Sequence, residues 1–159
     1  MFKLLFICTG NICRSPTAHG IFRHRLRASG LESSIEVDSA GIHGFHQGEA
    51  PDRRAIVTAG EFGVDIGDLR ARQVRPDDLD QFDIVAVMEQ SHRRQLQRLR
   101  AAPPRAEVRL LLSWLGRDED VPDPYYDDRA FIPVYRLIEQ GVDALFDEVR
   151  RRVNGSSGS

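Results

Sequence analysis

Residues 2–26 read FKLLFICTGNICRSPTAHGIFRHRL, and this segment sets the architecture expected for the whole chain. Residues 2–8 are apolar apart from one lysine, which is typical of a strand buried on both faces. Ser15 and Pro16 then give a strong helix start, with a hydroxyl at the N-cap and proline at the first helical position, and we expect that helix to end at Gly30. Strand, loop and helix in this order open a βαβ unit.

The rest of the chain alternates in the same way between short apolar runs and helical periodicity. We expect strands over residues 35–39, 82–88 and 107–112, and helices over 51–60, 90–100 and 133–153. Alternating strands and helices predict one α/β domain, a four-stranded parallel sheet with helices on both faces. The polar segment 116–132 is longer than an ordinary connection, and such loops in compact domains usually carry function.

Size and charge exclude several classes of protein. With 159 residues, 41% of them hydrophobic, the chain has the composition of an ordinary globular domain, which we expect to span residues 1–153. The tail 154–159, NGSSGS, is expected to be flexible or a leftover of cloning. A net charge of −2 argues against a nucleic-acid partner, so the arginine clusters are interpreted as solvated helix faces.

The chain has two cysteines, Cys8 and Cys13, which are too few for a disulfide scaffold or a four-cysteine zinc site. The histidines show no ligand spacing beyond chance, so we assign no metal and no cofactor. The N-terminal apolar run is too short for a signal peptide, and no segment approaches the 18 apolar residues of a membrane span. We expect a reduced, cytoplasmic protein with no membrane partner; unconventional export stays open. We expect a monomer, with weak self-association left open.

The loop CTGNICRS, residues 8–15, is the candidate functional site. It leaves the carboxyl end of the first strand and enters a helix N-terminus, where unpaired N–H groups and partial positive charge favour an anion such as phosphate. Gly10 and Asn11 let the backbone curl, and Arg14 offers a planar fork for two phosphate oxygens. Cys8 lies in this field, which should stabilise its thiolate as a nucleophile. A buried structural cysteine is the plain alternative.

Two motifs resemble those of the low-molecular-weight protein tyrosine phosphatases. Residues 8–16, CTGNICRSP, look like the phosphate-binding loop of that family, and residues 123–126, DPYY, look like its general-acid loop. Further similarity lies at 38–41 (DSAG), 51–55 (PD, then RA after one residue) and 71–73 (ARQ). The resemblance covers nearly the whole chain and implies a doubly wound, flavodoxin-like fold of the phosphotyrosine phosphatase I type.

The resemblance also implies a mechanism for hydrolysing phosphotyrosine monoesters in protein substrates. Cys8 would be the nucleophile of a cysteinyl-phosphate intermediate, Arg14 and the loop amides would bind the phosphate, and Asp123 would be the general acid and then the base. The remaining phosphate-binding loop residues would be Thr9, Gly10, Asn11, Ile12, Cys13 and Ser15. Ser15 would also hydrogen-bond the Cys8 sulfur.

Other residues take supporting roles in this interpretation. Ser39 resembles a residue that holds the loop in shape, and Phe45, Tyr125 and Tyr126 are candidates for the walls of a cleft that stacks an aromatic phosphomonoester. A deep cleft would let phosphotyrosine reach the nucleophile where the shorter phosphoserine cannot. For Phe45 the alternative is core packing, and for the 123–126 motif it is a surface turn.

The sequence departs from the family pattern at two places. The family has a histidine two positions before the Ala-Arg-Gln triplet, where this chain has Leu69, so we expect Asn11 to be oriented by Ser39 and backbone groups alone. The family also has Met-Asp with Asn three residues after the Asp, where this chain has Glu89 and His92, and no loop-supporting role is expected for these two.

The sequence argues against three alternatives to a tyrosine phosphatase. Related protein-arginine phosphatases tend to carry threonine at the position of Ile12, so the isoleucine favours tyrosine. An arsenate reductase of similar fold needs further downstream cysteines, and none follows Cys13. A non-catalytic phosphotyrosine-binding module would have no use for Asp123. Cys13 is interpreted either as a guard that traps oxidised Cys8 in a disulfide or as a packing residue.

Overall fold

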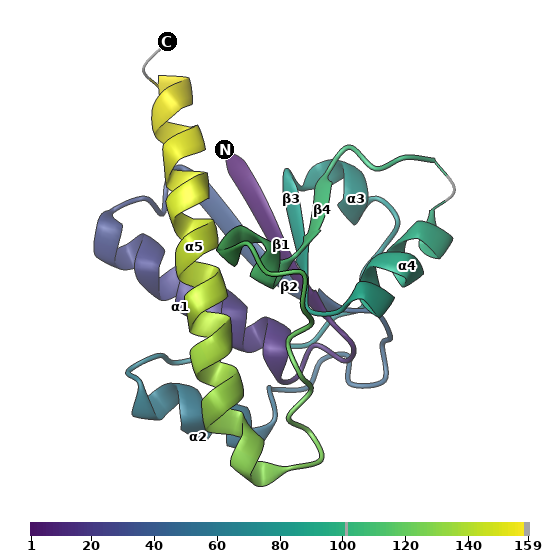
Figure 1. Cartoon of the computed structure of the whole chain (residues 1–159), viewed down its shortest axis with the longest axis vertical. Coiled ribbons are helices and arrows are strands. Elements are labelled where there is room, and N and C mark those ends of the chain that lie inside the picture. The colour runs from purple at the N-terminus through teal and green to yellow at the C-terminus, as the bar shows by residue number, and fades with distance from the viewer. Residues whose placement is uncertain (101, 158–159) are drawn as a thin grey trace.

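The sheet has four parallel strands, as the sequence predicts (Figure 1). The computed structural model describes residues 1–100 and 102–157, without the side chains of 156 and 157. The spatial order of the strands is β2-β1-β3-β4. Their bounds are β1 Phe2–Cys8, β2 Ile35–Gly41, β3 Ile84–Val87 and β4 Glu107–Leu110. The chain places β2 on one side of β1 and then crosses to place β3 and β4 on the other side. The carboxyl end of β1 is therefore the topological switch point, where open parallel sheets bind ligands.

Helices cover both faces of this sheet. One layer contains α1 and α5, with α2 packed near the start of α5, and the other contains α3 and α4 (Figure 1). The helices are α1 Arg14–Ser29, α2 Arg53–Glu61, α3 Asp78–Gln81, α4 Gln90–Leu99 and α5 Phe131–Ser157, with short 3-10 helices at Leu111–Leu115 and Asp128–Ala130.

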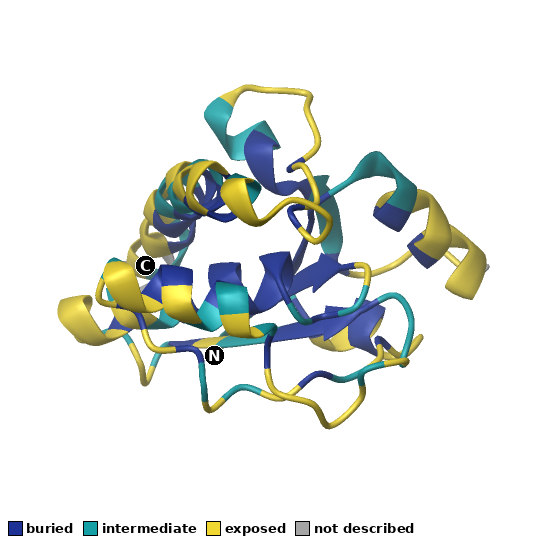
Figure 2. Ribbon diagram, turned by 90° about the horizontal axis from the view of Figure 1, so that it is seen from below, coloured by how far each residue is buried: buried dark blue, intermediate teal, exposed yellow. Residues whose placement is uncertain are grey.

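The strand β1 divides its side chains between two hydrophobic cores. Leu4 and Phe6 pack on the side of α1 and α5, whereas Leu5 and Ile7 pack on the side of α3 and α4. Figure 2 shows the strands as a buried layer between helices whose outer faces are exposed. Burial on both faces explains why the segment reads as a continuous apolar run and not as an alternating one.

Several helix boundaries differ by a few residues from the sequence expectation, and the differences at the start of α1 and the end of α5 matter most. The helix α1 begins at Arg14 with Cys13 at its N-cap, so Ser15 is not the capping residue; the helix ends at Gly30 as expected, and that glycine is left-handed. The helix α5 continues to Ser157, so residues 154–157 of the expected flexible tail are helical, whereas 158–159 lie outside the described residues. The sequence did not predict this extension, because the residues are polar and resemble a flexible tail. A polar segment can nevertheless continue a helix that precedes it.

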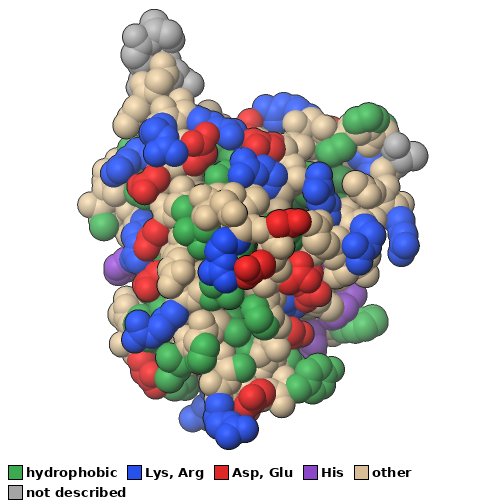
Figure 3. Space-filling model, viewed as in Figure 1, with side chains coloured by type: hydrophobic (Ala, Val, Ile, Leu, Met, Phe, Trp, Pro, Cys, Tyr) green, Lys and Arg blue, Asp and Glu red, His purple; other side chains and the backbone are tan. Residues whose placement is uncertain are grey.

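The surface mixes charges of both signs. Figure 3 shows Lys and Arg side chains interspersed with Asp and Glu across one face. On α5, Arg150 pairs with Asp147, and Arg151 pairs with Glu148. This arrangement agrees with the interpretation of the arginine clusters as solvated helix faces. In the described part of the chain, no helix is long and apolar enough to cross a membrane.

Candidate active site

The loop after β1 folds back over the sulfur of Cys8. The Cys8 Sγ atom lies 3.0 Å from the Ser15 hydroxyl oxygen and accepts a hydrogen bond from the Asn11 backbone N–H at 3.3 Å. Gly41, at the end of β2, permits this path, because a Cβ atom there would lie 2.8 Å from the backbone carbon of Gly10. The sulfur therefore has two hydrogen-bond partners at the base of the loop, one a side chain and one a backbone amide.

Asn11 fixes the curvature of the loop. Its φ of 59° is left-handed, as its residue type allows, and its side-chain amide donates to the Ser15 hydroxyl at 2.7 Å. Its side-chain oxygen accepts from the backbone N–H of Arg72 at 3.0 Å. The expected backbone support is present, but the expected partner Ser39 is not: the Ser39 hydroxyl pairs with Nδ1 of His19 at 2.9 Å.

His19 occupies a position that the sequence did not single out. It lies on α1 and is buried, and this burial lowers the pKa of its imidazole to about 4. A neutral ring pairs with Ser39 without the cost of a buried charge. His19 lies on a different element from Leu69. The absence of the family's histidine at the position of Leu69 therefore did not indicate that His19 would contact Ser39.

Arg14 points into the site from the first turn of α1 and is 2% exposed. Its Nη1 atom donates to a carboxylate oxygen of Glu89 at 2.5 Å and to the carbonyl oxygen of Val121 at 2.8 Å. Its Nη2 atom lies 3.4 Å from the Thr9 hydroxyl and 3.7 Å from a carboxylate oxygen of Asp123. Nη1 thus anchors the guanidinium, whereas Nη2 faces Thr9 of the loop and Asp123.

Glu89 and His92 support the loop, contrary to the sequence expectation. Both lie at the start of α4, where the Glu89 carboxylate and the His92 ring form a reciprocal capping box. Burial opposes ionisation of Glu89, yet its hydrogen bond with Arg14 lowers the pKa of that carboxyl. The Nε2 atom of His92 lies 2.9 Å from the Thr9 hydroxyl. Glu89 and His92 differ from the residues of the family pattern, but their side chains still form hydrogen bonds with residues of the loop.

A cavity of about 230 Å³ lies over the loop and brings the three predicted catalytic residues together. Cys8 and Arg14 form its floor, and Asp123 lines it from the segment between the 3-10 helix Leu111–Leu115 and α5. The Asp123 side chain is 41% exposed, and its second oxygen accepts from the Tyr125 backbone N–H at 3.1 Å. A carboxyl facing a nucleophile and a guanidinium across a cavity can exchange a proton with a bound ester.

The walls of the cavity agree only in part with the sequence expectation. Tyr125 and Tyr126 line it, with their rings edge to face at 5.0 Å between centroids. Phe45 does not line it: its ring is 83% exposed and stacks on the ring of His43 at 4.2 Å. His43 and His46 also line the cavity, and they are among the histidines for which the sequence indicated no role.

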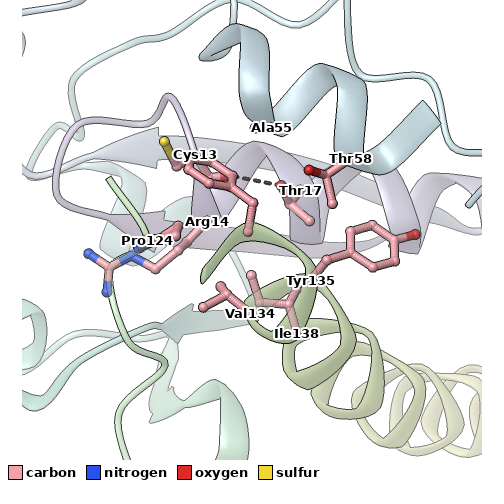
Figure 4. A pocket seen from close by; sticks show the side chains of 10 residues that line it. Cys13, Arg14, Thr17, Ala55, Thr58, Pro124, Val134, Tyr135 and Ile138 are labelled. Carbon is pink, nitrogen blue, oxygen red and sulfur yellow. Dashed lines mark hydrogen bonds between the residues drawn. The ribbon is translucent and has the colours of Figure 1, made fainter. Parts of the chain in front are cut away.

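Cys13 lines two cavities, of which one is the cavity over the loop that it shares with Cys8. The other is a small cavity between α1, α2 and α5, where the Thr17 hydroxyl donates to the carbonyl oxygen of Cys13 at 2.7 Å (Figure 4). Both cysteines are free and buried, and burial, reinforced by the nearby Asp52, raises the pKa of the Cys13 thiol. The raised pKa disfavours the thiolate of Cys13, and the guard and packing interpretations of this residue both stay predictions.

Arg54 joins the two loops of the site and was not predicted. From α2 it forms hydrogen bonds with both oxygens of Asp52, whose backbone N–H donates to the carbonyl oxygen of Ile12. It also donates to the carbonyl oxygen of Tyr125 at 2.9 Å and to Asp128 at 2.6 Å. Its signal in the sequence was the 51–55 similarity, to which no role had been attached.

Comparisons with known proteins agree with this geometry. Residues 3–155 match the family model of the low molecular weight phosphotyrosine protein phosphatases. A low molecular weight protein-tyrosine-phosphatase of Streptomyces coelicolor is 40% identical over 162 residues, covering 97% of each chain. The crystal structure of YfkJ from Bacillus subtilis matches with a TM-score of 0.89 at 36% identity, over 96% of each chain. That of DARP, a Drosophila arginine phosphatase, matches with a TM-score of 0.85 at 29% identity, over 93% of this chain and 98% of that chain.

Proposed function

Because the chain belongs to the low-molecular-weight phosphotyrosine protein phosphatases, which are hydrolases, we propose that it hydrolyses phosphotyrosine in proteins through a phosphorylated Cys8. The observation that carries this proposal is the single cavity of about 230 Å³ shared by Cys8, Arg14 and Asp123. These side chains supply a nucleophile, a planar cation for the phosphoryl oxygens and a proton donor, which are the groups that phosphoryl transfer to a thiolate requires.

In the first step the Cys8 thiolate attacks phosphorus in line with the leaving phenolic oxygen. A sulfur–phosphorus bond forms as the phosphorus–oxygen bond breaks, and Asp123 passes its proton to the departing tyrosine oxygen. The guanidinium of Arg14 needs no reorganisation during this step, because Glu89 and the carbonyl of Val121 already hold it in place.

In the second step water attacks the phosphorus of the intermediate, and Asp123, now a carboxylate, takes the proton of that water. The phosphorus–sulfur bond breaks and inorganic phosphate leaves. The Ser15 hydroxyl, 3.0 Å from the Cys8 sulfur, stabilises the departing thiolate by donating a hydrogen bond to it.

Tyrosine is the side chain that fits the walls of the cavity. Tyr125 and Tyr126 offer aromatic faces to a phenyl ring, and a nucleophile at the floor of a cavity favours a long ester over the shorter phosphoserine. Phosphoarginine is the second candidate, because the fold is shared with an arginine phosphatase. Ile12, which lines the cavity, favours tyrosine because it adds an apolar surface where a hydroxyl would serve a guanidinium.

Two further inferences belong to this proposal. We place the reaction in the cytoplasm, since a nucleophilic Cys8 must stay reduced. We also propose a monomer that needs no cofactor, because the two chemical steps use only side chains of this chain and water.

The test is turnover of phosphotyrosine peptide and p-nitrophenyl phosphate in the presence of EDTA. We expect the wild type to be active and Cys8→Ser to be inactive, with a control in Cys13→Ser, which keeps the nucleophile. Wild-type protein without turnover, or Cys8→Ser with substantial turnover, would refute the proposal.

The substrate assignment has its own test in Ile12→Thr. The ratio of phosphoarginine to phosphotyrosine turnover should rise in this variant, because threonine replaces an apolar wall with a hydroxyl. An unchanged ratio, or a wild type that prefers phosphoarginine, would reject the assignment to tyrosine.

A further inference from the structure

The hydroxyl of Thr9 sits beside the guanidinium of Arg14 and takes part in a hydrogen-bond chain that begins on α4. The chain runs from the backbone N–H of Glu89 to Nδ1 of His92 at 3.2 Å, and from Nε2 of His92 to the Thr9 hydroxyl at 2.9 Å. Its direction can be derived from donors and acceptors, because one end is a backbone N–H, which can only donate.

His92 must present a lone pair at Nδ1 to accept from that backbone N–H. A neutral imidazole then carries its hydrogen on Nε2, so His92 donates to Thr9 and not the reverse. The ring is 1% exposed, and burial together with the facing charge of Arg14 lowers the pKa of His92 to about 4, so the ring is neutral at physiological pH. The carboxylates of Glu89, Asp120 and Asp123 oppose this shift without reversing it.

The Thr9 hydroxyl is then saturated as an acceptor. Its oxygen has two lone pairs, of which one accepts from His92 and the other faces Nη2 of Arg14 at 3.4 Å. Its single O–H is left to donate elsewhere. Thr9 is exposed and lines the same cavity as Cys8 and Arg14, so an oxygen of a phosphoryl group held by Arg14 can replace solvent as the acceptor of its O–H.

We propose that Thr9 is a substrate-binding residue whose hydroxyl donates a hydrogen bond to the transferring phosphoryl group, and that His92 is a positioning residue that fixes the direction of that hydroxyl. This inference rests on the proposed function and deepens it, because it adds a side-chain donor to the loop amides and Arg14. It also gives His92 a second task besides capping α4.

The test compares Thr9→Val, which has the same shape without the hydroxyl, with Thr9→Ser, which keeps it. The readouts are kcat/KM for phosphotyrosine peptide and Kd for inorganic phosphate by calorimetry. We expect Thr9→Val to weaken both by about 10- to 100-fold, the range for a hydrogen bond to a charged group, and Thr9→Ser to stay within about threefold of the wild type. Thr9→Val within about twofold of the wild type, or equal losses in both variants, would overturn the proposal.

His92→Asn tests the positioning role. Asparagine can keep the bond at the start of the helix, since its amide oxygen takes the place of Nδ1 and accepts from the Glu89 N–H, but its shorter side chain has no donor at the position of Nε2 beside Thr9. We expect its loss in phosphate affinity to match that of Thr9→Val and the double variant to lose nothing further, because both act through one hydroxyl. Additive losses would contradict this coupling.

The phosphate measurement separates the two proposals. If wild-type protein binds phosphate with the expected Thr9 dependence but turns over no ester, the proposed function fails and the Thr9 contact stands. If wild-type protein is active and Thr9→Val is unimpaired in both readouts, the proposed function stands and the Thr9 contact fails.

Discussion

The loop over residues 8–15 and the segment that carries Asp123 face each other across one cavity, but they are held in different ways. The backbone of the first is anchored by Ile42 and Asp52, and its side chains are tied to one another and to α4. In the second, Val121 and Pro124 are the only buried residues between 116 and 129. The group that must hold charge is thus built into the core, whereas the group that must exchange a proton with water stays near solvent.

This contrast follows from what each step requires. A preorganised cation and its donors stabilise charge without reorganising during the reaction, which needs burial and fixed partners. A carboxyl that serves first as acid and then as base must reach both the leaving group and water, so partial exposure suits it. Variants of the loop and of the segment that carries Asp123 should therefore differ in their effects.

Removal of the acid should have the largest effect. Asp123→Asn keeps the shape of the side chain but carries no transferable proton, so we expect kcat for phenyl phosphate to fall about 10²- to 10³-fold. The loss in the phosphorylation step should be much smaller for p-nitrophenyl phosphate, whose leaving group departs without protonation. Burst kinetics on both esters measure this step, and equal losses would show that Asp123 is not the acid.

Acidification should lower the stability of the folded protein through two of its buried histidines. His19 and His92 both have a pKa of about 4 in the folded protein, below the ordinary 6.5, so the unfolded chain takes up protons first as pH falls. Their contribution to stability is therefore complete above about pH 6.5 and is lost between pH 6.5 and 4, on the order of 3 kcal/mol for each ring.

Urea unfolding at pH 7 and pH 4.5 measures this loss. His19→Gln should lose less stability over that interval than the wild type, because the glutamine does not titrate. A variant with the same pH dependence as the wild type would show that His19 is not the group responsible.

Two of the Arg–carboxylate pairs of the site offer a matched comparison. Glu89 pairs with Arg14, which is 2% exposed, whereas Asp128, which is 82% exposed, pairs with Arg54 at the surface. We expect Glu89→Gln to lower kcat/KM about 10-fold and Asp128→Asn to change it less than about twofold, since exposed pairs contribute little. Steady-state kinetics on one substrate would decide, and equal effects would contradict the contrast.

The smallest effects concern the cavity walls. Tyr125→Ala should raise KM for phosphotyrosine peptide severalfold, because it removes an aromatic contact, whereas Phe45→Ala should leave KM within about twofold. A large effect of Phe45→Ala would mean that this ring turns into the cavity when substrate binds, as the sequence had suggested.

The parts that the sequence predicted are those with local causes. The bounds of β1 and the end of α1 at Gly30 follow from an apolar run and a single residue type. The loop CTGNICRS was identified because its chemistry is contiguous in the chain. Asp123 was found although it is distant, because its own motif is also contiguous.

The parts that it missed depend on partners far apart in the chain. Ser39 was paired with Asn11 by similarity, but the fold places His19 of α1 beside it instead. Glu89 and His92 were set aside because their residue types differ from the family pattern, although a longer carboxylate and an imidazole reach the same loop. Side-chain reach in three dimensions is what local patterns do not report.

Rapid-quench mass spectrometry of Asp123→Asn during turnover of p-nitrophenyl phosphate tests the nucleophile itself. This ester forms the intermediate without an acid, and loss of the base slows the attack of water, so the phosphorylated protein should accumulate. We predict a mass increase of one phosphoryl group on the peptide that contains Cys8, and none in Asp123→Asn combined with Cys8→Ser. A phosphoryl group on another residue, or product formation without any adduct, would contradict the mechanism.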